Sequence, residues 1–272
     1  MPGGFPLGLE LCAGTDQGTD TSTSGGTAVT GGSGTANGSY TQLVASSAQD
    51  ACAILVTLRK DTTSFVNPGA VSIAVGAAAS EQDILTDFPL YFPGGTSGTI
   101  NFLLPIQIPA GSRISARARG GDTYNVQVTL FDGAFTMMEG GAGADPLGFT
   151  TGTADFGTSV AASGSTNTKG SYSQVVASTT MDYIGFLFTL YDSNNTGQVG
   201  NAGRYLFDIA IGAGGSEVPI VPNLPVVDNT GNTGIHSLFF PIPIPSGTRI
   251  AVRCQCATAS KTFSTVLHGV YQ

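Results

Sequence analysis

Short apolar runs separated by turns rich in glycine, serine and threonine recur along the chain. Residues 51–58 and 183–190 are nearly continuous apolar runs. Runs of this length, bounded by Gly-rich turns and enriched in Val, Ile, Phe and Thr, are typical of strands buried on both faces. Few stretches combine good helix formers without a Gly or Pro break, so the pattern predicts an all-β protein.

A strict alternation of polar and apolar positions marks two further segments, residues 113–119 and 249–256. An alternation of period two places one set of side chains against a core and the other set in solvent. The arginines predicted to face solvent are Arg113, Arg117, Arg119, Arg249 and Arg253. This arginine stripe is the candidate interaction surface of the chain, although ordinary solvent-facing charge explains it equally well.

Both segments belong to an internal duplication. The matching blocks are residues 38–58 with 170–190, residues 71–84 with 207–220, and residues 102–117 with 238–253. The first block alone holds 11 identities in 21 positions. Three collinear blocks predict that the chain is two copies of one domain, each large enough for its own core.

The duplication divides the chain into an N-terminal arm (residues 1–12), a first domain (13–139) and a second domain (140–272). Each copy is expected to be a β-sandwich, and a jelly roll is preferred over an immunoglobulin-like arrangement. The chain contains no Trp, so the Cys-Trp-Cys signature of antibody-type domains is absent. The predicted fold class is therefore all-β, with two tandem homologous β-sandwich domains. The Gly-rich arm is expected to extend over a neighbouring subunit, so that deleting residues 1–12 weakens assembly.

Composition restricts the expected partners more than it alters the predicted fold. The 272 residues include 10 basic and 18 acidic ones, which gives a net charge of −8 and argues against nucleic acid as a partner. The chain has no apolar run of about 18 residues, so no membrane partner is expected. Four cysteines are too few for a disulfide framework, which favours a protein made and kept reduced in the cytoplasm.

No set of residues points to catalysis, to a cofactor or to a metal. The only histidines, His236 and His268, lie in the second copy without a triad or a metal-ligand context. Cys254 and Cys256 fall on the apolar side of their alternation and are expected to be buried as small hydrophobic residues. No P-loop or nucleophile elbow is present. We therefore predict that the protein is not an enzyme.

One acidic residue recurs in each copy, as Glu81 and Glu217. Glycoside hydrolysis needs two carboxylates at one site, whereas here a single glutamate repeats per domain. A structural role is the better interpretation. We expect Glu81 to pair with Arg113 or Arg117, and Glu217 to pair with Arg249 or Arg253.

The repeated motifs carry a resemblance to a known group of proteins. Gly-Ser-Tyr-x-Gln-x-Val-Ala-Ser, then Ile-Ala-x-Gly-Ala with Ser-Glu, then Pro-Ile-x-Ile-Pro-x-Gly-x-Arg-Ile resemble structural proteins of tailed bacteriophage virions, and the resemblance extends over both copies. Among these, capsid decoration or cement proteins are the most similar. The resemblance implies a non-enzymatic virion protein that binds the major capsid protein or other virion proteins, forms a homo-oligomer and stabilises the phage head.

Other roles stay open at this level. Tail, baseplate or fibre components are the next most similar group, and a double jelly-roll coat protein is a third, against which the short length argues. A glycan-binding module on the host surface is the alternative of a different class. Its candidate platforms are the aromatic residues Tyr40, Tyr91, Phe92, Tyr124 and Tyr172.

Overall fold

The fold is known from a computed structural model that describes residues 11–12, 26–60, 69–90, 98–131, 141–152, 157–191, 203–228, 236–257 and 262–272. The described residues contain strands and no helix, which confirms the all-β prediction for that part of the chain. The strands of the first half are β1 (Leu11–Cys12), β2 (Thr27–Gly32), β3 (Thr41–Val44), β4 (Ala53–Lys60), β5 (Gly69–Val75), β6 (Gln82–Leu90), β7 (Gly98–Leu104), β8 (Ile114–Arg119) and β9 (Thr123–Phe131). Those of the second half are β10 (Gly143–Leu147), β11 (Thr158–Ala161), β12 (Ser173–Val176), β13 (Gly185–Tyr191), β14 (Gly203–Ile211), β15 (Val218–Asp228), β16 (His236–Phe240), β17 (Ile250–Cys256) and β18 (Thr262–Tyr271).

The first domain is one long hairpin rolled into a sandwich. Strand β2 pairs with β9, β3 with β8, β4 with β7 and β5 with β6, so that the pairing proceeds inward from the two ends of the segment. Strand β9 also pairs with β4, and β8 pairs with β5, which assembles two four-stranded sheets, β2-β9-β4-β7 and β3-β8-β5-β6. A rolled hairpin of eight strands in two sheets is a jelly roll.

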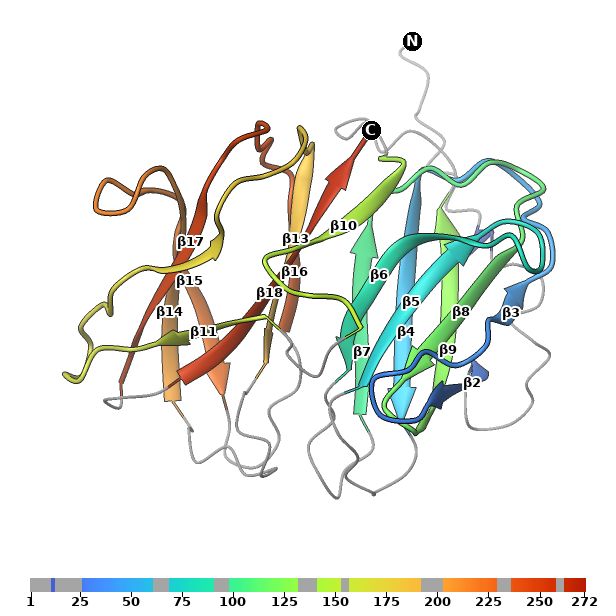
Figure 1. Cartoon of the computed structure of the whole chain (residues 1–272), viewed down its shortest axis with the longest axis horizontal. Coiled ribbons are helices and arrows are strands. Elements are labelled where there is room, and N and C mark those ends of the chain that lie inside the picture. Colours follow the sequence, from blue (N-terminus) through green and yellow to red (C-terminus); the bar gives the residue numbers. More distant parts are fainter. Residues whose placement is uncertain are drawn as a thin grey trace, which may run out of the picture.

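The second domain repeats this topology strand for strand. Its pairs are β11 with β18, β12 with β17, β13 with β16 and β14 with β15. The additional pairs β13 with β18 and β14 with β17 complete its two sheets. The chain therefore consists of two tandem jelly rolls, as the duplication predicted, and they appear as two lobes side by side in Figure 1.

Strand β10 connects the two lobes through its backbone. It pairs with β18 of the second domain over five residues and meets β6 of the first domain in one parallel bridge, between Ala144 and Leu85. Just before β10, the N–H of Gly141 donates to the carbonyl of Pro105 at 2.6 Å, and the N–H of Gln107 donates to the carbonyl of Gly141 at 2.8 Å. In Figure 1, β10 runs between the lobes.

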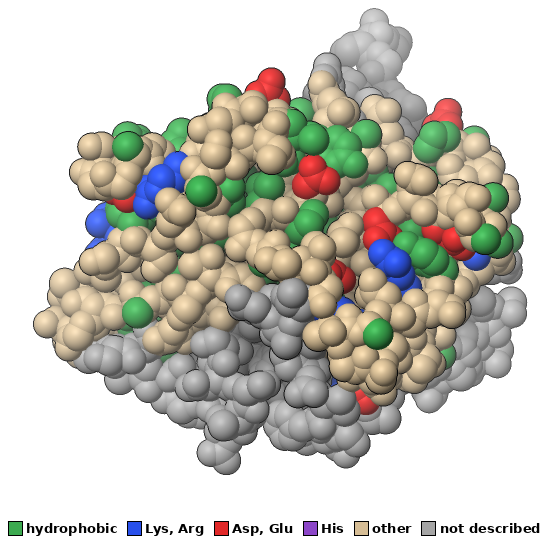
Figure 2. Space-filling view, in the orientation of Figure 1, with side chains coloured by type: hydrophobic (Ala, Val, Ile, Leu, Met, Phe, Trp, Pro, Cys, Tyr) green, Lys and Arg blue, Asp and Glu red, His purple; other side chains and the backbone are tan. Residues whose placement is uncertain are grey.

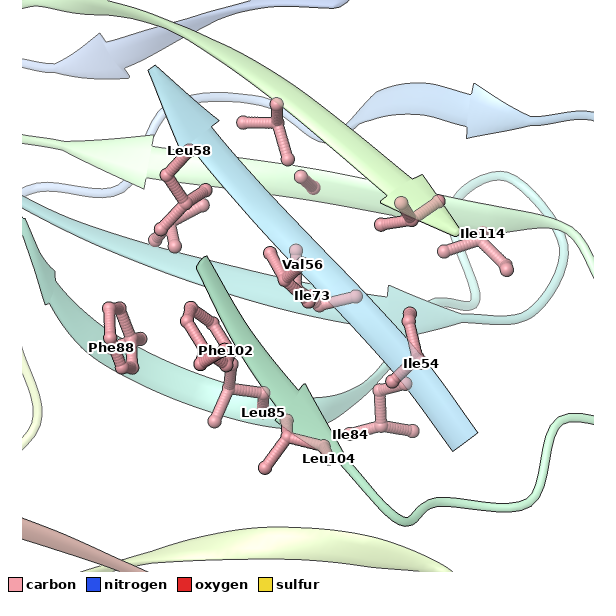
Figure 3. Packing of buried hydrophobic residues seen from close by; sticks show 14 of the residues in the cluster. Ile54, Val56, Leu58, Ile73, Ile84, Leu85, Phe88, Phe102, Leu104 and Ile114 are labelled. Atoms are coloured by element: carbon pink, nitrogen blue, oxygen red, sulfur yellow. The ribbon is translucent and has the colours of Figure 1, made fainter. Parts of the chain in front are cut away.

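Each domain has its own apolar core. In the first domain, Ile54 and Val56 of β4 face Ile73 of β5 and Leu85 of β6 between the two sheets, as Figure 3 shows. The core of the first domain continues into the second, because Leu187, Val266 and Val270 belong to the same cluster of buried residues. The lobes are thus held together by apolar packing as well as by β10.

Parts of the predicted organisation fall outside the described residues. The predicted boundary at 139/140 and residues 1–10 of the predicted arm lie there. Residues 11–12 of the arm form β1, which pairs with β9 of the same chain. Strand β2, also in the Gly-rich segment, likewise pairs with β9. The described parts of this segment thus pair within their own domain; contact with a neighbouring subunit remains a prediction.

Candidate interaction surface

Arg113 is bound by a small polar cluster on the outer face of the sheet β3-β8-β5-β6. Its Nη1 donates to Glu81 Oε1 at 2.8 Å and to the carbonyl of Gly76 at 3.3 Å, and its Nε donates to Gln42 Oε1 at 3.1 Å. Gly76 has a φ of +122°, a conformation that favours glycine, and it turns its carbonyl toward the arginine at the end of β5. The cluster links the ends of all four strands of the sheet, β3, β8, β5 and β6.

The second domain contains the same cluster at equivalent positions. Arg249 Nη1 donates to Glu217 Oε1 at 3.0 Å and to the carbonyl of Gly212 at 3.0 Å, and Arg249 Nε donates to Gln174 Oε1 at 2.9 Å. The predicted pairing of the repeated glutamates with the repeated arginines is confirmed. These glutamates act as structural partners of arginine.

The electrostatics of the two glutamates agree with this role. For Glu81, desolvation acts to raise the pKa, but a hydrogen bond from its own backbone and the bond from Arg113 outweigh it, and the net pKa is lowered. For Glu217, its own backbone hydrogen bond is the largest influence and, with Arg249, lowers the pKa. Both carboxylates are therefore held in the charged form.

Arg117 lies on β8, on the same outer face of the sheet as the Arg113 cluster. Its Nη2 donates to Asp83 Oδ2 at 2.5 Å, and its guanidinium lies over the ring of Tyr40 at 4.7 Å from the centroid. The hydroxyl of Tyr40 donates to Asp83 Oδ1 at 2.7 Å. Desolvation, followed by this bond to Asp83, raises the pKa of Tyr40 to about 12.

Arg253 takes the equivalent place in the second domain but uses an acid from a different strand. Its Nε donates to Asp208 Oδ2 at 2.8 Å, and its guanidinium lies 4.4 Å from the ring centroid of Tyr172. Lys169 Nζ donates to Asp208 Oδ1 at 2.8 Å, and the N–H of Asn223 donates to the same oxygen at 2.8 Å. Desolvation acts to raise the pKa of Asp208, but these donors outweigh it and the pKa is lowered.

Arg119 does not face solvent, and this part of the predicted stripe is wrong. Its side chain is 1% exposed and its Nη2 lies 3.4 Å from Asp87 Oδ2. The N–H of Gly152, in the segment after β10, donates to that oxygen at 2.7 Å. Ser115, which shares the outer face, is also buried. Alternation predicted the correct side of the sheet for Arg119, but it could not show that Arg119 and Asp87 would form a buried pair beside the segment after β10.

Each of the five arginines therefore pairs with a carboxylate of its own chain. The paired acids are Glu81, Asp83, Asp87, Glu217 and Asp208. Blue and red side chains accordingly lie against one another in both lobes, and charged side chains are sparse on the rest of the face in Figure 2. The stripe forms two equivalent, internally neutralised polar clusters, and Arg117 and Arg253 are its most exposed members, at 26% and 31%.

Sequence reasoning missed the aspartates and the lysine of these clusters. Asp83 lies on β6, whereas Asp208 lies on β14, at the position that Ser72 occupies on β5 of the first domain. Because the acid changes strand between the copies, the repeat alignment carries no signal for it. The repeated Tyr and Gln of the Ser-Tyr-x-Gln motif were the available signal, since both contact the arginines.

The candidate aromatic platforms are mostly occupied within the chain. Tyr124 is 2% exposed and so cannot present a ring to a ligand, while Tyr40 and Tyr172 each lie beneath an arginine. Tyr91 and Phe92 lie outside the described residues. In both copies the repeated tyrosine therefore packs against an arginine of its own chain.

Cys254, Cys256 and His268 take structural positions. Cys254 and Cys256 are buried in the core of the second domain, as the alternation predicted. His268 is fully buried between the domains, where its Nε2 lies 3.0 Å from the carbonyl of Thr86. A carbonyl only accepts, so Nε2 carries the proton. Within the described ranges, no three His, Cys, Asp or Glu side chains gather as a metal site.

Comparison with known proteins adds little to this geometry. No protein-family model matches the chain, and no curated protein matches it. Among solved structures, it is similar to the N-terminal CBM22-1–CBM22-2 tandem domain of Xyn10C from Paenibacillus barcinonensis, with 10% identity over 85% of this chain and 82% of that chain, at a TM-score of 0.25. A similarity this low carries no argument about function. The described part of the chain contains no helix with the length and hydropathy of a membrane span.

Proposed function

We propose that the chain is a non-enzymatic structural protein of a virion, and specifically a decoration or cement protein that binds and stabilises the head through protein–protein contacts. The observation that carries this proposal is the joining of two equivalent jelly rolls by β10 and a shared core. Jelly rolls are a common fold of viral capsid proteins.

Two equivalent domains in a fixed arrangement suit a partner whose binding surface is present in many copies. A capsid lattice presents one surface many times at fixed spacing. A body that carries two similar faces at a fixed separation can bind two neighbouring copies, and the second contact then forms at a high effective concentration. The polar clusters around Arg113 and Arg249, with the same partners at nearly the same distances, are such a pair of faces.

The neutralised charges also fit this role. A contact that covers a free guanidinium must remove its hydration, which is costly unless the partner supplies an acid. Here each arginine already has a carboxylate partner in its own chain, so a protein surface can cover the face at a smaller cost. Arg117 and Arg253 are exposed enough to add a contact at its rim.

Loss and restoration of the protein on particles test the proposal. Virions that lack it are expected to assemble heads that open at a lower temperature, and addition of the purified protein is expected to restore the wild-type opening temperature. The protein should be found in purified wild-type virions by mass spectrometry. Its absence from virions, or heads that neither bind it nor gain stability, would contradict the proposal.

One substitution tests the arginine stripe as the contact. Arg253→Gln leaves Asp208 paired with Lys169 at 2.8 Å, so the domain is expected to remain folded. Its affinity for heads should fall severalfold relative to wild type, measured by co-sedimentation. Lys169→Gln, which leaves Asp208 paired with Arg253 instead, is the matched control and should bind as wild type. Equal binding by wild type and both variants would show that the arginine stripe is not part of the contact.

The jelly-roll topology favours one second candidate, a coat subunit. Two complete rolled hairpins in one chain would let three chains form a ring of six similar domains. The deletion experiment separates the two roles, because loss of a coat subunit abolishes the shell, whereas loss of a cement protein leaves a weakened shell. A host-surface glycan module is a further outcome, which selective binding on a glycan array would indicate.

A further inference from the structure

The edge of the second domain formed by β15 and β16 carries apolar residues that are more exposed than their equivalents on the edge of the first domain formed by β6 and β7. The register of the two domains gives the equivalences. Ile84, Leu85, Phe88 and Phe102 of the first domain correspond to Ile220, Val221, Leu224 and Leu238 of the second. The second domain has therefore kept apolar residues at each of these positions.

The exposure of these residues differs between the copies. Phe102 is 3% exposed and stacks on Phe88, with ring centroids 4.0 Å apart. Its equivalent, Leu238, is 45% exposed. Ile220, Val221 and Leu224 are only partly buried, whereas their equivalents in the first domain are buried. One exposed and three half-buried apolar residues thus lie at positions that are buried in the first domain, as expected for an interaction surface.

The second domain itself covers the edge of the first. The outer face of its sheet β11-β18-β13-β16 contributes Leu187, Val266 and Val270 to the core of the first domain, and Phe239 packs against that core. His268 from the same face donates to the carbonyl of Thr86 on β6. The contact is therefore head to tail: a jelly-roll edge meets the sheet face of the next jelly roll.

The first domain carries the same sheet face at equivalent positions. Leu55, Thr57, Leu103 and Gln127 correspond by register to Leu187, Thr189, Phe239 and Val266. They are partly exposed. On this face the hydroxyl of Thr57 donates to Asn101 at 2.8 Å, and on the buried face of the second domain Thr189 and Ser237 are bonded at 2.9 Å. One chain thus has one partly exposed apolar edge and one partly exposed sheet face in the same register as the face that covers the first domain's edge.

We propose that the β15–β16 edge of one chain binds the outer face of β4, β7 and β9 in a second copy of this chain. The contact repeats between chains the arrangement that joins the two domains within a chain. It is a heterologous contact, so repetition closes into a ring if the rotation between successive domains allows it and extends into a filament otherwise.

The prolines of β15 determine the kind of contact. Pro219, Pro222 and Pro225 lack an N–H, so β15 is poorly suited to accept another strand by backbone pairing. In the first domain, β6 likewise meets β10 in a single bridge, and side-chain packing supplies the rest of the contact. The proposed contact is therefore made by apolar side chains, in the same way.

Sedimentation velocity of the full chain in solution tests the contact. Wild type is expected to form oligomers whose proportion rises with concentration in sedimentation velocity experiments. Leu238→Asp should shift the population to monomer. Val218→Asp is the matched control, because Val218 lies on β15 and is 62% exposed, but corresponds to Gln82, which stays exposed in the first domain. It should assemble as wild type.

Mixing two variants tests the head-to-tail geometry. Leu55→Asp removes the opposite surface and should also give monomers. A mixture of Leu238→Asp and Leu55→Asp chains retains one intact edge and one intact face, so it should form 1:1 dimers and nothing larger. This result also shows that both variants are folded; if Leu238→Asp lacks a cooperative unfolding transition, Leu238→Gln replaces it. A wild type that is monomeric at every concentration, variants that assemble as wild type, or a mixture that stays monomeric would overturn the proposal.

Discussion

At the scale of single residues, the two copies place different side chains at one pair of equivalent positions. Asp87 and Asn223 occupy equivalent positions with φ of +52°, a conformation in which Asp and Asn are tolerated better than most residues. In the first domain Asp87 pairs with the buried Arg119; the equivalent pair of positions in the second domain holds Asn223 and Gln255. The charged pair lies where the segment after β10 contacts the first domain, through Gly152.

Copying the second domain's residues into the first tests this comparison. Arg119→Gln alone leaves the carboxylate of Asp87 buried without its arginine and should lower the free energy of unfolding by about 3–5 kcal/mol. The double variant Arg119→Gln with Asp87→Asn replaces the ion pair by neutral amides and should recover most of that loss. Urea unfolding measures both. A double variant as unstable as the single one would show that the ion pair itself is required.

His268 predicts how stability depends on pH. Burial lowers its pKa to about 4, against an ordinary value of 6.5, although the hydrogen bond to Thr86 acts in the opposite direction. The unfolded chain therefore takes up a proton below about pH 6.5, and the folded chain does not do so until about pH 4. The stability contributed by neutral His268 is complete above pH 6.5 and is lost as the pH falls through this window, up to roughly 3 kcal/mol.

Comparison with His268→Gln isolates this contribution. The variant lacks the titrating ring, so its free energy of unfolding should fall less steeply between pH 6.5 and pH 4 than that of wild type. Ionisable groups other than His268 are common to both proteins, so their contributions cancel in the difference. Parallel pH profiles would show that His268 does not titrate as its burial requires.

At the scale of elements, glycines mark turns that both copies use. Gly111 and Gly247 have φ of +80° and +78°, and Gly76 and Gly212 have φ of +122° and +113°. Their recurrence in the sequence therefore has a backbone reason. Gly148, just after β10, also has positive φ, but here a Cβ would lie 1.9 Å from the carbonyl oxygen of Val175, whereas a Cβ at Gly111 would meet nothing within 4 Å.

These two glycines make a matched pair of substitutions. Gly111→Ala should cost about 1 kcal/mol, since positive φ is the only penalty. Gly148→Ala should cost clearly more, because the backbone of Val175 must also move. Thermal unfolding by circular dichroism measures the difference. Equal shifts in Tm would show that the turn after β10 relaxes freely and does not fix the junction.

The polar and apolar pattern of the sequence predicted the strands well, but it did not predict which of their outward-facing residues are buried. Alternation around Arg113 and Arg249, and the repeated glutamates, were enough to predict the two ion pairs. Alternation could not predict that Arg119 is buried, because it reports the side of the strand and not what packs on that side; here Asp87, which is bonded to Gly152 after β10, lies 3.4 Å away. The matching blocks also do not extend to the last strand, where the strand register makes His268 equivalent to Thr129.

At the scale of the whole molecule, the domains share a core and are expected to unfold together. Separation would expose Leu187, Val266 and Val270, which now pack against the first domain. We predict one calorimetric transition, with the calorimetric enthalpy equal to the van't Hoff enthalpy. Two resolved transitions would mean that the lobes are independent and that their two polar clusters are not held at a fixed separation.

The location of the protein in a particle tests the central claim most directly. Cryo-electron microscopy of purified virions should show two-lobed density of this fold on the outside of the head, with both lobes contacting neighbouring coat subunits. Heads without such density, together with absence of the protein from the rest of the virion, would contradict the proposal that it is a virion structural protein.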